Sequence, residues 1–208
     1  SSQVGCAQGC RFCLTASGGF IRNLTPGEII SQIRDTQKLI ETENKNARVT
    51  NIVFMGMGEP LANFKNLTQA LEIINDTDNG LKFSSRRVTV SKCGLIPRLK
   101  DLGSATKVNL AISLNATDDK TRSYLMTINN KYPLKDLINA CKEYSLSPRQ
   151  KITFEYILIK DINDKEEDEK IHIDSLPIYH TKNGRVVLGG GGIVPDYIIK
   201  HDTLTRMT

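Results

Sequence analysis

Three cysteines near the start of the sequence have a spacing that suits a metal centre. They lie in GCAQGCRFCLTASGGF as Cys6, Cys10 and Cys13, separated by three and then two residues. Disulfides between such close neighbours are geometrically awkward, so we expect metal-bound thiols in a reducing compartment. A structural zinc ion takes four ligands, commonly from paired CxxC units. No fourth ligand follows at that spacing, although structural zinc and free thiols remain alternatives.

A [4Fe–4S] cluster fits three thiols better than zinc does. Its four irons normally take four thiolates, so three protein ligands leave one iron open. The amino and carboxylate groups of S-adenosylmethionine can fill that position, and reduction then releases a 5′-deoxyadenosyl radical. Phe12 would give the loop an apolar face beside the site. The other cysteines, Cys93 and Cys141, are single residues of a kind that is more often buried than reactive.

These residues must be positioned by an α/β framework. Apolar runs that are unbroken suit strands covered on both faces, as in parallel sheets. Four such runs occupy residues 50–57, 86–91, 107–115 and 151–159. The strands alternate with helical patterns, which is typical of a β/α barrel or a doubly wound sheet. In either fold, functional sites form at the carboxyl ends of the strands.

The first predicted helix has a clear beginning. Thr25 can cap it, Pro26 suits its first position, and Glu28 completes a capping box. An apolar stripe then predicts its buried face, made of Ile29, Ile30, Ile33 and Leu39. The further helices are predicted near residues 65–76, 95–102, 117–126 and 134–145.

Composition sets the class of protein and its surroundings. The chain has 208 residues, enough for a real core, and a net charge of +5. Residues 161–170 hold six acids and two lysines, so the rest of the chain is more basic. This gives mild support for a polyanionic partner such as RNA. The sequence shows neither an apolar run of membrane-spanning length nor a signal segment, so we expect a cytoplasmic protein without a membrane partner.

The character of the sequence changes past residue 165. Residues 166–208 show short β-like pieces and glycine turns, and the glycine run 189–192 lacks the Gly-Lys-Ser/Thr of a phosphate-binding loop. We therefore predict a core over residues 1–165 and an unrelated β-rich tail over 166–208.

Residues 1–165 resemble a known family of radical S-adenosylmethionine enzymes. That family methylates carbon 2 of an adenine in 23S rRNA and in some tRNAs, and a sister branch methylates carbon 8. The resemblance implies an incomplete parallel β/α barrel of the radical type. It is carried by SSQVGCAQGCRFCLTASGGFIRNLTPGEI, NIVFMGMGEPLANFKN, RRVTVSKCGLIPRLKDL, NLAISLNATDDKTRSYLMTINNKYPL and ITFEYILIKDIND.

The same resemblance assigns residues to cofactors. It implies that Cys6, Cys10 and Cys13 hold the [4Fe–4S] cluster, and that Gly58 and Glu59 bind the methionine end of S-adenosylmethionine. Relatives often carry histidine at position 115, where asparagine can also donate and accept hydrogen bonds. The further contacts to S-adenosylmethionine implied at strand ends are Ser91, Ser113, Leu114 and Asn115.

The resemblance also implies partners and a relay of two further cysteines. The partners would be 23S rRNA, tRNA and an electron donor, with the protein as a monomer. One relay cysteine belongs just before SSQVGC and the other after the sixth strand, and neither is in the sequence. No catalytic residue is therefore identified, and a cluster-binding remnant without catalysis is the alternative.

The tail carries a second resemblance. Residues 179–203, with GRVVLGGGGIVPD, resemble a β segment of carboxyl-terminal processing serine proteases. That segment lacks the serine–lysine pair of such proteases, and Ser175 has no nucleophile context. We interpret the chain as a chimera of a radical-enzyme core and this tail, and a protease function as the least favoured hypothesis.

Overall fold

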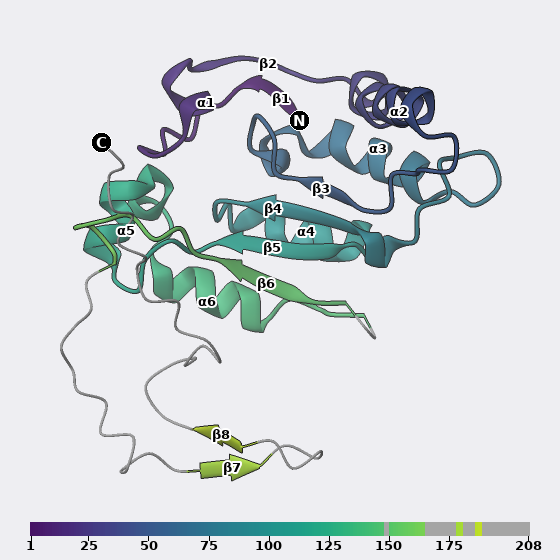
Figure 1. Cartoon of the computed structure of the whole chain (residues 1–208). Coiled ribbons are helices and arrows are strands. Elements are labelled where there is room, and N and C mark those ends of the chain that lie inside the picture. The colour runs from purple at the N-terminus through teal and green to yellow at the C-terminus, as the bar shows by residue number, and fades with distance from the viewer. Residues whose placement is uncertain (148–149, 165–177, 181–185, 189–208) are drawn as a thin grey trace, which may run out of the picture. The chain divides into compact units, whose positions relative to one another are not determined.

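The computed structural model describes residues 1–147, 150–164, 178–180 and 186–188 (Figure 1). The chain divides into two compact units, Ser1–Lys165 and Glu166–Thr208. In the second unit, strands β7 (Ile178–His180) and β8 (Val186–Leu188) pair antiparallel. Ser175, the glycine run 189–192 and most of the protease-like segment lie outside the described residues.

A four-stranded parallel sheet forms the centre of the first unit. Its order is β3-β4-β5-β6, and each of the four apolar runs supplies one strand, as predicted. Chain order and spatial order agree because a helix returns the chain after each of β3, β4 and β5. The strands are β3 (Ile52–Phe54), β4 (Val88–Lys92), β5 (Asn109–Ser113) and β6 (Ile152–Glu155).

All five predicted helices are present. The long ones are α2 (Pro26–Glu43), α3 (Phe64–Asn75), α4 (Pro97–Ala105), α5 (Asp119–Leu125) and α6 (Leu134–Lys142). Shorter turns of helix join them: α1 (Leu14–Ser17), η1 (Pro60–Asn63), η2 (Ser85–Arg87) and η3 (Thr127–Asn130).

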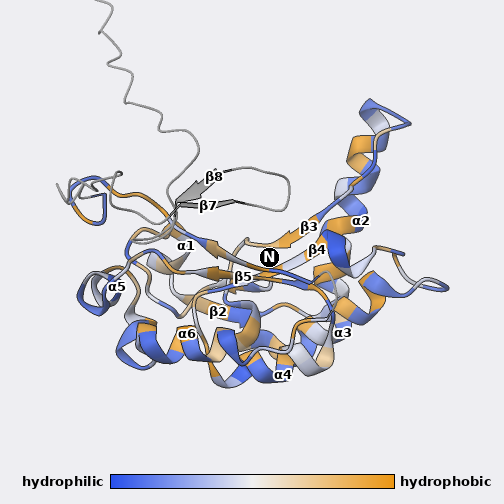
Figure 2. Cartoon of the chain, turned by 90° about the horizontal axis from the view of Figure 1, so that it is seen from below, coloured by the Kyte–Doolittle hydropathy of each residue, from blue (hydrophilic) through white to orange (hydrophobic). Residues whose placement is uncertain are grey.

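The hydrophobic core lies between one face of the sheet and helices α3, α4 and α6, which stand in a row along that face (Figure 2). Alternate strand residues point into it, because successive side chains of a strand face opposite sides. Val90 on β4 and Leu110 on β5 lie opposite each other in register and are fully buried. Because this face of the sheet packs on the helices, polar side chains at the strand ends lie on the opposite face of the sheet.

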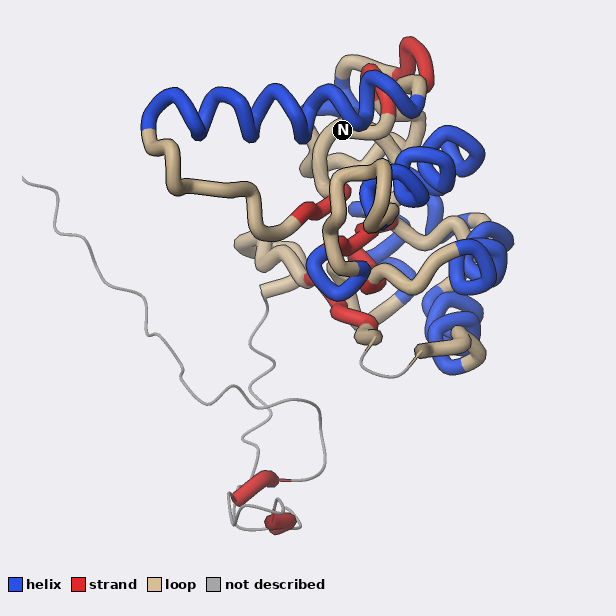
Figure 3. The backbone as a smooth tube through the Cα atoms, turned by 90° about the vertical axis from the view of Figure 1, so that its right-hand side faces the viewer, coloured by secondary structure: helices blue, strands red, loops and turns tan. Residues whose placement is uncertain are grey.

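The predicted apolar stripe of α2 is only partly correct. Ile29 is buried, and Ile30 and Ile33 pack against the core. Leu39 is 64% exposed, because the carboxyl half of this long helix extends beyond the body of the unit (Figure 3). The stripe therefore buries α2 only over its first two turns.

The strand before the cysteine loop does not join the parallel sheet. Strand β1 (Gln3–Gly5) pairs antiparallel with β2 (Phe20–Asn23) in a separate two-stranded sheet, so the parallel sheet of the described residues has four strands. Gly5 makes the close pairing possible, because its φ is +76° and a Cβ there would meet the Gly19 carbonyl oxygen at 1.9 Å. The amides of Ser2 and Gln3 donate to the Met57 carbonyl instead, at 2.9 and 3.2 Å. Across the described ranges, no helix combines the length and apolar character that crossing a membrane requires.

Candidate metal-cluster and cofactor site

All three cysteines of the amino-terminal loop line one cavity of about 300 Å³ at the carboxyl ends of the strands. The same cavity is lined by Gly58 and Glu59 after β3, and by Ser91 and Ser113 on β4 and β5. Seven predicted site residues thus line one cavity, although they come from four separate parts of the chain. Phe12 also lines the cavity, which confirms the apolar face predicted for the loop.

The cysteine loop is held by contacts to the segment around α5. The Arg11 amide donates to the Leu125 carbonyl at 2.9 Å, and the Thr127 hydroxyl donates to the Gln8 carbonyl at 2.6 Å. Cys10 packs against the small cluster formed by Cys93, Leu125 and Met126. These contacts fix the loop over the strand ends even though its own helix, α1, is a single turn.

Burial controls the protonation of the thiols in the metal-free chain. It raises the pKa of Cys10 to about 11, and the neighbouring thiols of Cys6 and Cys13 add to this through electrostatic repulsion. Burial also raises the pKa of Cys6. Three soft sulfur donors that face one cavity and repel one another as thiolates are a donor set suited to iron–sulfur binding, because a metal would neutralise that repulsion. Within the described residues, no three Cys, His, Asp or Glu side chains group closely enough for a single metal ion.

A tight turn after β3 aims Glu59 at the cavity. Gly58 has φ +95°, and a Cβ there would lie 2.4 Å from the Gln3 Cβ. Glu59 is 3% exposed, and its two carboxylate oxygens accept hydrogen bonds from the amides of Leu61 at 3.1 Å and Cys93 at 2.9 Å. Burial raises the pKa of this carboxyl group. Each oxygen keeps further acceptor capacity for a ligand.

A carboxylate that the sequence analysis missed lies between the two predicted serines. Glu155, the last residue of β6, accepts hydrogen bonds at Oε2 from the hydroxyls of Ser91 and Ser113, both at 3.0 Å. Its Oε1 is buried and has no partner among the described residues. The available signal was an acid at the carboxyl end of an otherwise apolar strand, KITFEYILI, where sites are expected to form.

Two of the predicted cofactor contacts lie beside the cavity rather than on its lining. Leu114 and Asn115 follow Ser113 but are not among the residues that line the cavity. Asn115 has φ +59°, a conformation that asparagine tolerates. Its Oδ1 accepts from the Ile157 amide at 3.0 Å, and its Nδ2 contacts the Met126 sulfur at 3.3 Å. In this structure Asn115 therefore joins the end of β5 to the chain after β6.

Two buried cations near the strand ends were also missed. Arg122 is fully buried and donates to the carbonyls of Cys93 at 2.7 Å, Ser113 at 3.1 Å and Leu114 at 3.0 Å. Lys92 is 2% exposed, and its Nζ has no hydrogen-bond partner among the described residues. Burial lowers the pKa of Lys92 to about 7.

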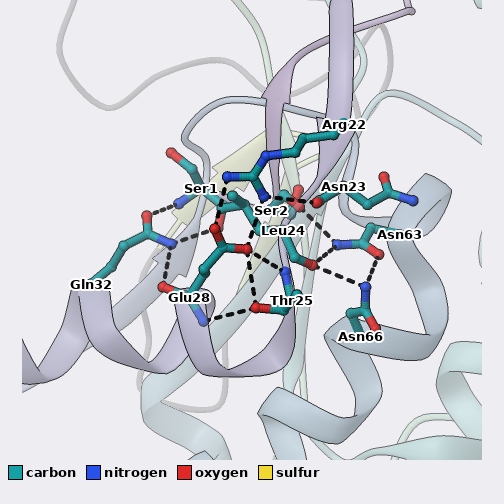
Figure 4. A network of polar contacts seen from close by, with 10 residues as sticks. All are labelled: Ser1, Ser2, Arg22, Asn23, Leu24, Thr25, Glu28, Gln32, Asn63 and Asn66. Carbon is teal, nitrogen blue, oxygen red and sulfur yellow. Dashed lines mark hydrogen bonds and ion pairs between the residues drawn. The ribbon is translucent and has the colours of Figure 1, made fainter.

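The predicted capping box anchors β2, the strand that follows the cysteine loop (Figure 4). The Thr25 hydroxyl accepts from the Glu28 amide at 3.3 Å, and Glu28 accepts from the Thr25 amide at 2.8 Å. Arg22 on β2 binds both oxygens of Glu28, at 2.9 and 2.8 Å, and lowers the Glu28 pKa to about 2. Asn63 in turn donates to the carbonyls of Ser2 and Leu24 at 2.8 and 2.7 Å. The β1–β2 pair is thus tied to both α2 and η1.

The chain is similar to known proteins over most of its length. The model of the radical SAM superfamily matches residues 1–172. A relative named dual-specificity RNA methyltransferase RlmN, from Desulfosudis oleivorans, is 59% identical over 168 residues, which cover 81% of this chain and 44% of that protein. The protein of the same name from Syntrophobacter fumaroxidans is 51% identical over 170 residues, which cover 82% of this chain and 48% of that one.

A solved structure is also similar. The crystal structure of a radical SAM methyltransferase from Sphaerobacter thermophilus superposes with a TM-score of 0.73 at 40% identity, over 79% of this chain and 48% of that chain. The chain thus spans about half the length of the curated relatives it matches.

Proposed function

Because the chain belongs to the radical SAM superfamily, we propose that it forms the cofactor-binding core of an RNA methyltransferase acting on carbon 2 of adenine. The observation that carries the proposal is the convergence of Cys6, Cys10, Cys13 and Glu59 on one cavity at the strand ends. Similarity to proteins named as RNA methyltransferases supports this reaction over the protease-type and non-catalytic alternatives.

We assign the residues as follows. Cys6, Cys10 and Cys13 hold a [4Fe–4S] cluster through their thiolates and leave one iron open. When bound, cluster and S-adenosylmethionine together supply a 5′-deoxyadenosyl radical on reduction. Glu59 accepts a hydrogen bond from the amino group of the bound methionine, since its carboxylate is buried at the cavity and held by two backbone amides. Gly58 keeps the turn open to the ligand.

The strand ends bind the rest of the cofactor. Ser91 and Ser113 face the cavity from β4 and β5 and offer hydroxyl groups to S-adenosylmethionine. Leu114 and Asn115 act from just outside the lining, where Asn115 fixes the chain that follows β6. The apolar Phe12 and Met126 cover the same cavity and restrict the entry of water.

The proposed partners follow from the same family relationship. They are 23S rRNA and tRNA as substrates and an electron donor that reduces the cluster, with the protein acting as a cytoplasmic monomer. The net charge of +5 supports a polyanionic substrate. The two relay cysteines of the resembling family have no counterpart in the 208 residues, so methyl transfer is proposed for a chain that also supplies them. Residues 166–208 are proposed to be a separate β-like tail.

The proposal is tested by anaerobic reconstitution of the 208-residue chain with iron and sulfide. Electron paramagnetic resonance of the reduced protein should show a [4Fe–4S] signal, and S-adenosylmethionine should shift it by binding the open iron. A folded protein that forms no cluster, or a cluster whose signal S-adenosylmethionine leaves unchanged, would contradict the proposal.

A further inference from the structure

We propose that the thiol of Cys93 binds the iron that the cysteine loop leaves open, and that S-adenosylmethionine displaces it on binding. This inference rests on the proposed function, because it concerns the same cluster. It gives a role to a cysteine that lies 80 residues after Cys13 and outside the three-cysteine motif. Neither the spacing of that motif nor the family resemblance assigns Cys93 to the cluster.

Cys93 is a fourth thiol at the cavity of the cysteine loop. It directly follows β4, and it lines the same cavity as Cys6, Cys10 and Cys13. Cys10 packs against the small hydrophobic cluster that contains Cys93. Four soft donors therefore share one cavity, and four thiolates are what a [4Fe–4S] cluster normally takes.

Charge repulsion indicates that the Cys93 thiol lies near the loop thiols. Cys93 is 8% exposed, and burial is the main reason why its pKa is well above the usual value. The Glu59 carboxylate raises this pKa further, and Cys10 and Cys6 add to the effect through electrostatic repulsion. The thiol is thus within electrostatic reach of two of the three proposed cluster ligands.

Glu59 indicates which side of the cluster Cys93 faces. In the proposed function, Glu59 binds the amino group of the methionine, and the same amino group is a ligand of the open iron. The open iron must therefore face Glu59. The Cys93 amide donates to Glu59 Oε2 at 2.9 Å, so residue 93 lies directly beside this carboxylate. Cys93 is consequently on the side of the cavity where the loop supplies no ligand.

The main chain holds residue 93 in place. Its amide binds Glu59, and its carbonyl accepts from Arg122 Nη2 at 2.7 Å. Both hydrogen bonds use backbone atoms, so they remain when the side chain is replaced. A variant that lacks only the thiol therefore tests ligation without removing the contacts that position this turn.

Ligation and displacement exchange bonds without any change in oxidation state. When Cys93 binds, its sulfur forms a bond to the iron and its proton goes to the solvent. When S-adenosylmethionine binds, its amino nitrogen and carboxylate oxygen form bonds to that iron, the bond from iron to the Cys93 sulfur breaks, and the thiolate takes up a proton. The thiol therefore competes with S-adenosylmethionine, whose apparent affinity falls with the fraction of molecules in which the iron is free.

The test compares the full chain, reconstituted with iron and sulfide, with its variant Cys93→Ala. Cys141→Ala removes a buried cysteine of α6 outside the cavity and is the matched control. Thiol reductants are removed after reconstitution, so that they cannot bind the iron. Mössbauer spectroscopy without S-adenosylmethionine distinguishes an iron bound only by sulfur from an iron bound by water. Equilibrium dialysis then measures the affinity for S-adenosylmethionine, and iron content and circular dichroism confirm loading and folding.

We expect the wild type and Cys141→Ala to hold irons bound only by sulfur, and Cys93→Ala to hold one distinct iron. Cys93→Ala should also bind S-adenosylmethionine about 10-fold more tightly than the wild type, the gain expected if the thiol occupies the iron in about nine-tenths of the molecules. A structural defect at the cavity would weaken binding, so the direction of the change separates competition from damage. Unchanged or weaker binding by a folded, loaded Cys93→Ala would overturn the inference.

The wild-type spectrum decides the matter even if Cys93→Ala does not fold. One distinct iron in the wild type without S-adenosylmethionine would refute ligation by Cys93 and leave the proposed function intact, provided that S-adenosylmethionine still shifts the cluster signal. A folded wild type that forms no cluster would refute the proposed function and this inference together.

Discussion

The carboxylate of Glu59 accepts a hydrogen bond from the backbone amide of Cys93 at 2.9 Å. This contact joins the turn after β3 to the chain that follows β4, across 34 residues of sequence. The other oxygen of Glu59 accepts from the Leu61 amide, so one buried side chain shapes its own turn and ties it to the neighbouring strand. The Glu59 carboxylate therefore stabilises the fold around the cavity and is also the group proposed to bind the ligand.

The variant Glu59→Gln separates these two contributions. In the wild type, both oxygens of Glu59 accept hydrogen bonds from backbone amides. In the variant, the side-chain NH₂ group replaces one oxygen and leaves one of these amides without an acceptor. We therefore expect a loss of about 1–3 kcal/mol in the free energy of unfolding. We also expect the reconstituted variant to lose the shift of its cluster signal on addition of S-adenosylmethionine, measured by electron paramagnetic resonance. A variant with unchanged stability and an unchanged shift would show that neither role is correct.

The cysteine loop gives a prediction that does not depend on activity. Cys10→Ser should abolish stable [4Fe–4S] incorporation, because it removes one of only three soft donors that the loop offers. Cys141→Ser, which changes a buried cysteine of α6 outside the cavity, is the control and should retain full loading. Iron and sulfide content and the visible absorption of the cluster provide the measurement. Equal loading of both variants would contradict the assignment.

The sequence predicts the framework of this fold well, because local signals determine it. Each apolar run became a parallel strand, and the capping box at Thr25 and Glu28 begins α2 at the predicted residue. The three cysteines were found by spacing alone, since ligands within one loop are close in sequence. These features need no knowledge of how distant segments pair.

What the sequence did not reveal depends on pairing between distant segments. Glu155 meets Ser113 only because β5 and β6 pair in that register, across 42 residues. A lysine such as Lys92 at a strand end normally suggests an exposed position, yet this side chain is buried, with its Nζ 6.0 Å from the centre of the Tyr144 ring. The antiparallel pairing of β1 arises because the cysteine loop returns immediately as β2, which no periodicity in a three-residue strand can indicate.

Burial of Lys92 should make the stability of the metal-free chain depend on pH. The pKa of Lys92 is about 7 in the folded chain, below its ordinary value of 10.5. The folded state therefore binds fewer protons than the unfolded state between these values, so this group makes the free energy of unfolding rise with pH across that window. Below pH 7 the penalty for burying the charge is complete and constant.

Lys92→Met should remove this contribution. We expect the variant to be more stable than the wild type by about 1–3 kcal/mol near neutral pH, with the difference shrinking toward pH 10, because the methionine buries no charge and no unpaired donor. Lys100→Met, at an exposed position of α4, is the control and should show no such trend. Urea unfolding at several pH values measures it, and a difference that is constant with pH would contradict the buried, titrating lysine.

The guanidinium of Arg122 gives the last prediction, because it fixes the strand ends that carry the serine and cysteine positions of the cavity. It donates to three carbonyls, those of Cys93, Ser113 and Leu114, and to Asn129 Oδ1 at 2.9 Å. Lysine cannot reproduce a planar fork of donors. Arg122→Lys should therefore leave buried carbonyls without partners and lower the free energy of unfolding by about 3 kcal/mol.

The same variant should weaken binding of S-adenosylmethionine, measured by equilibrium dialysis on the reconstituted protein, because Ser113 and the loop at Cys93 are no longer held together. Arg86→Lys changes an exposed arginine of η2 and is the control. It should leave the free energy of unfolding and the affinity for S-adenosylmethionine unchanged, because the effect belongs to the buried guanidinium of Arg122. Loss of stability with full affinity would show that Arg122 supports the fold alone. Loss of affinity beyond what the unfolded fraction explains would identify it as a positioning residue of the cavity.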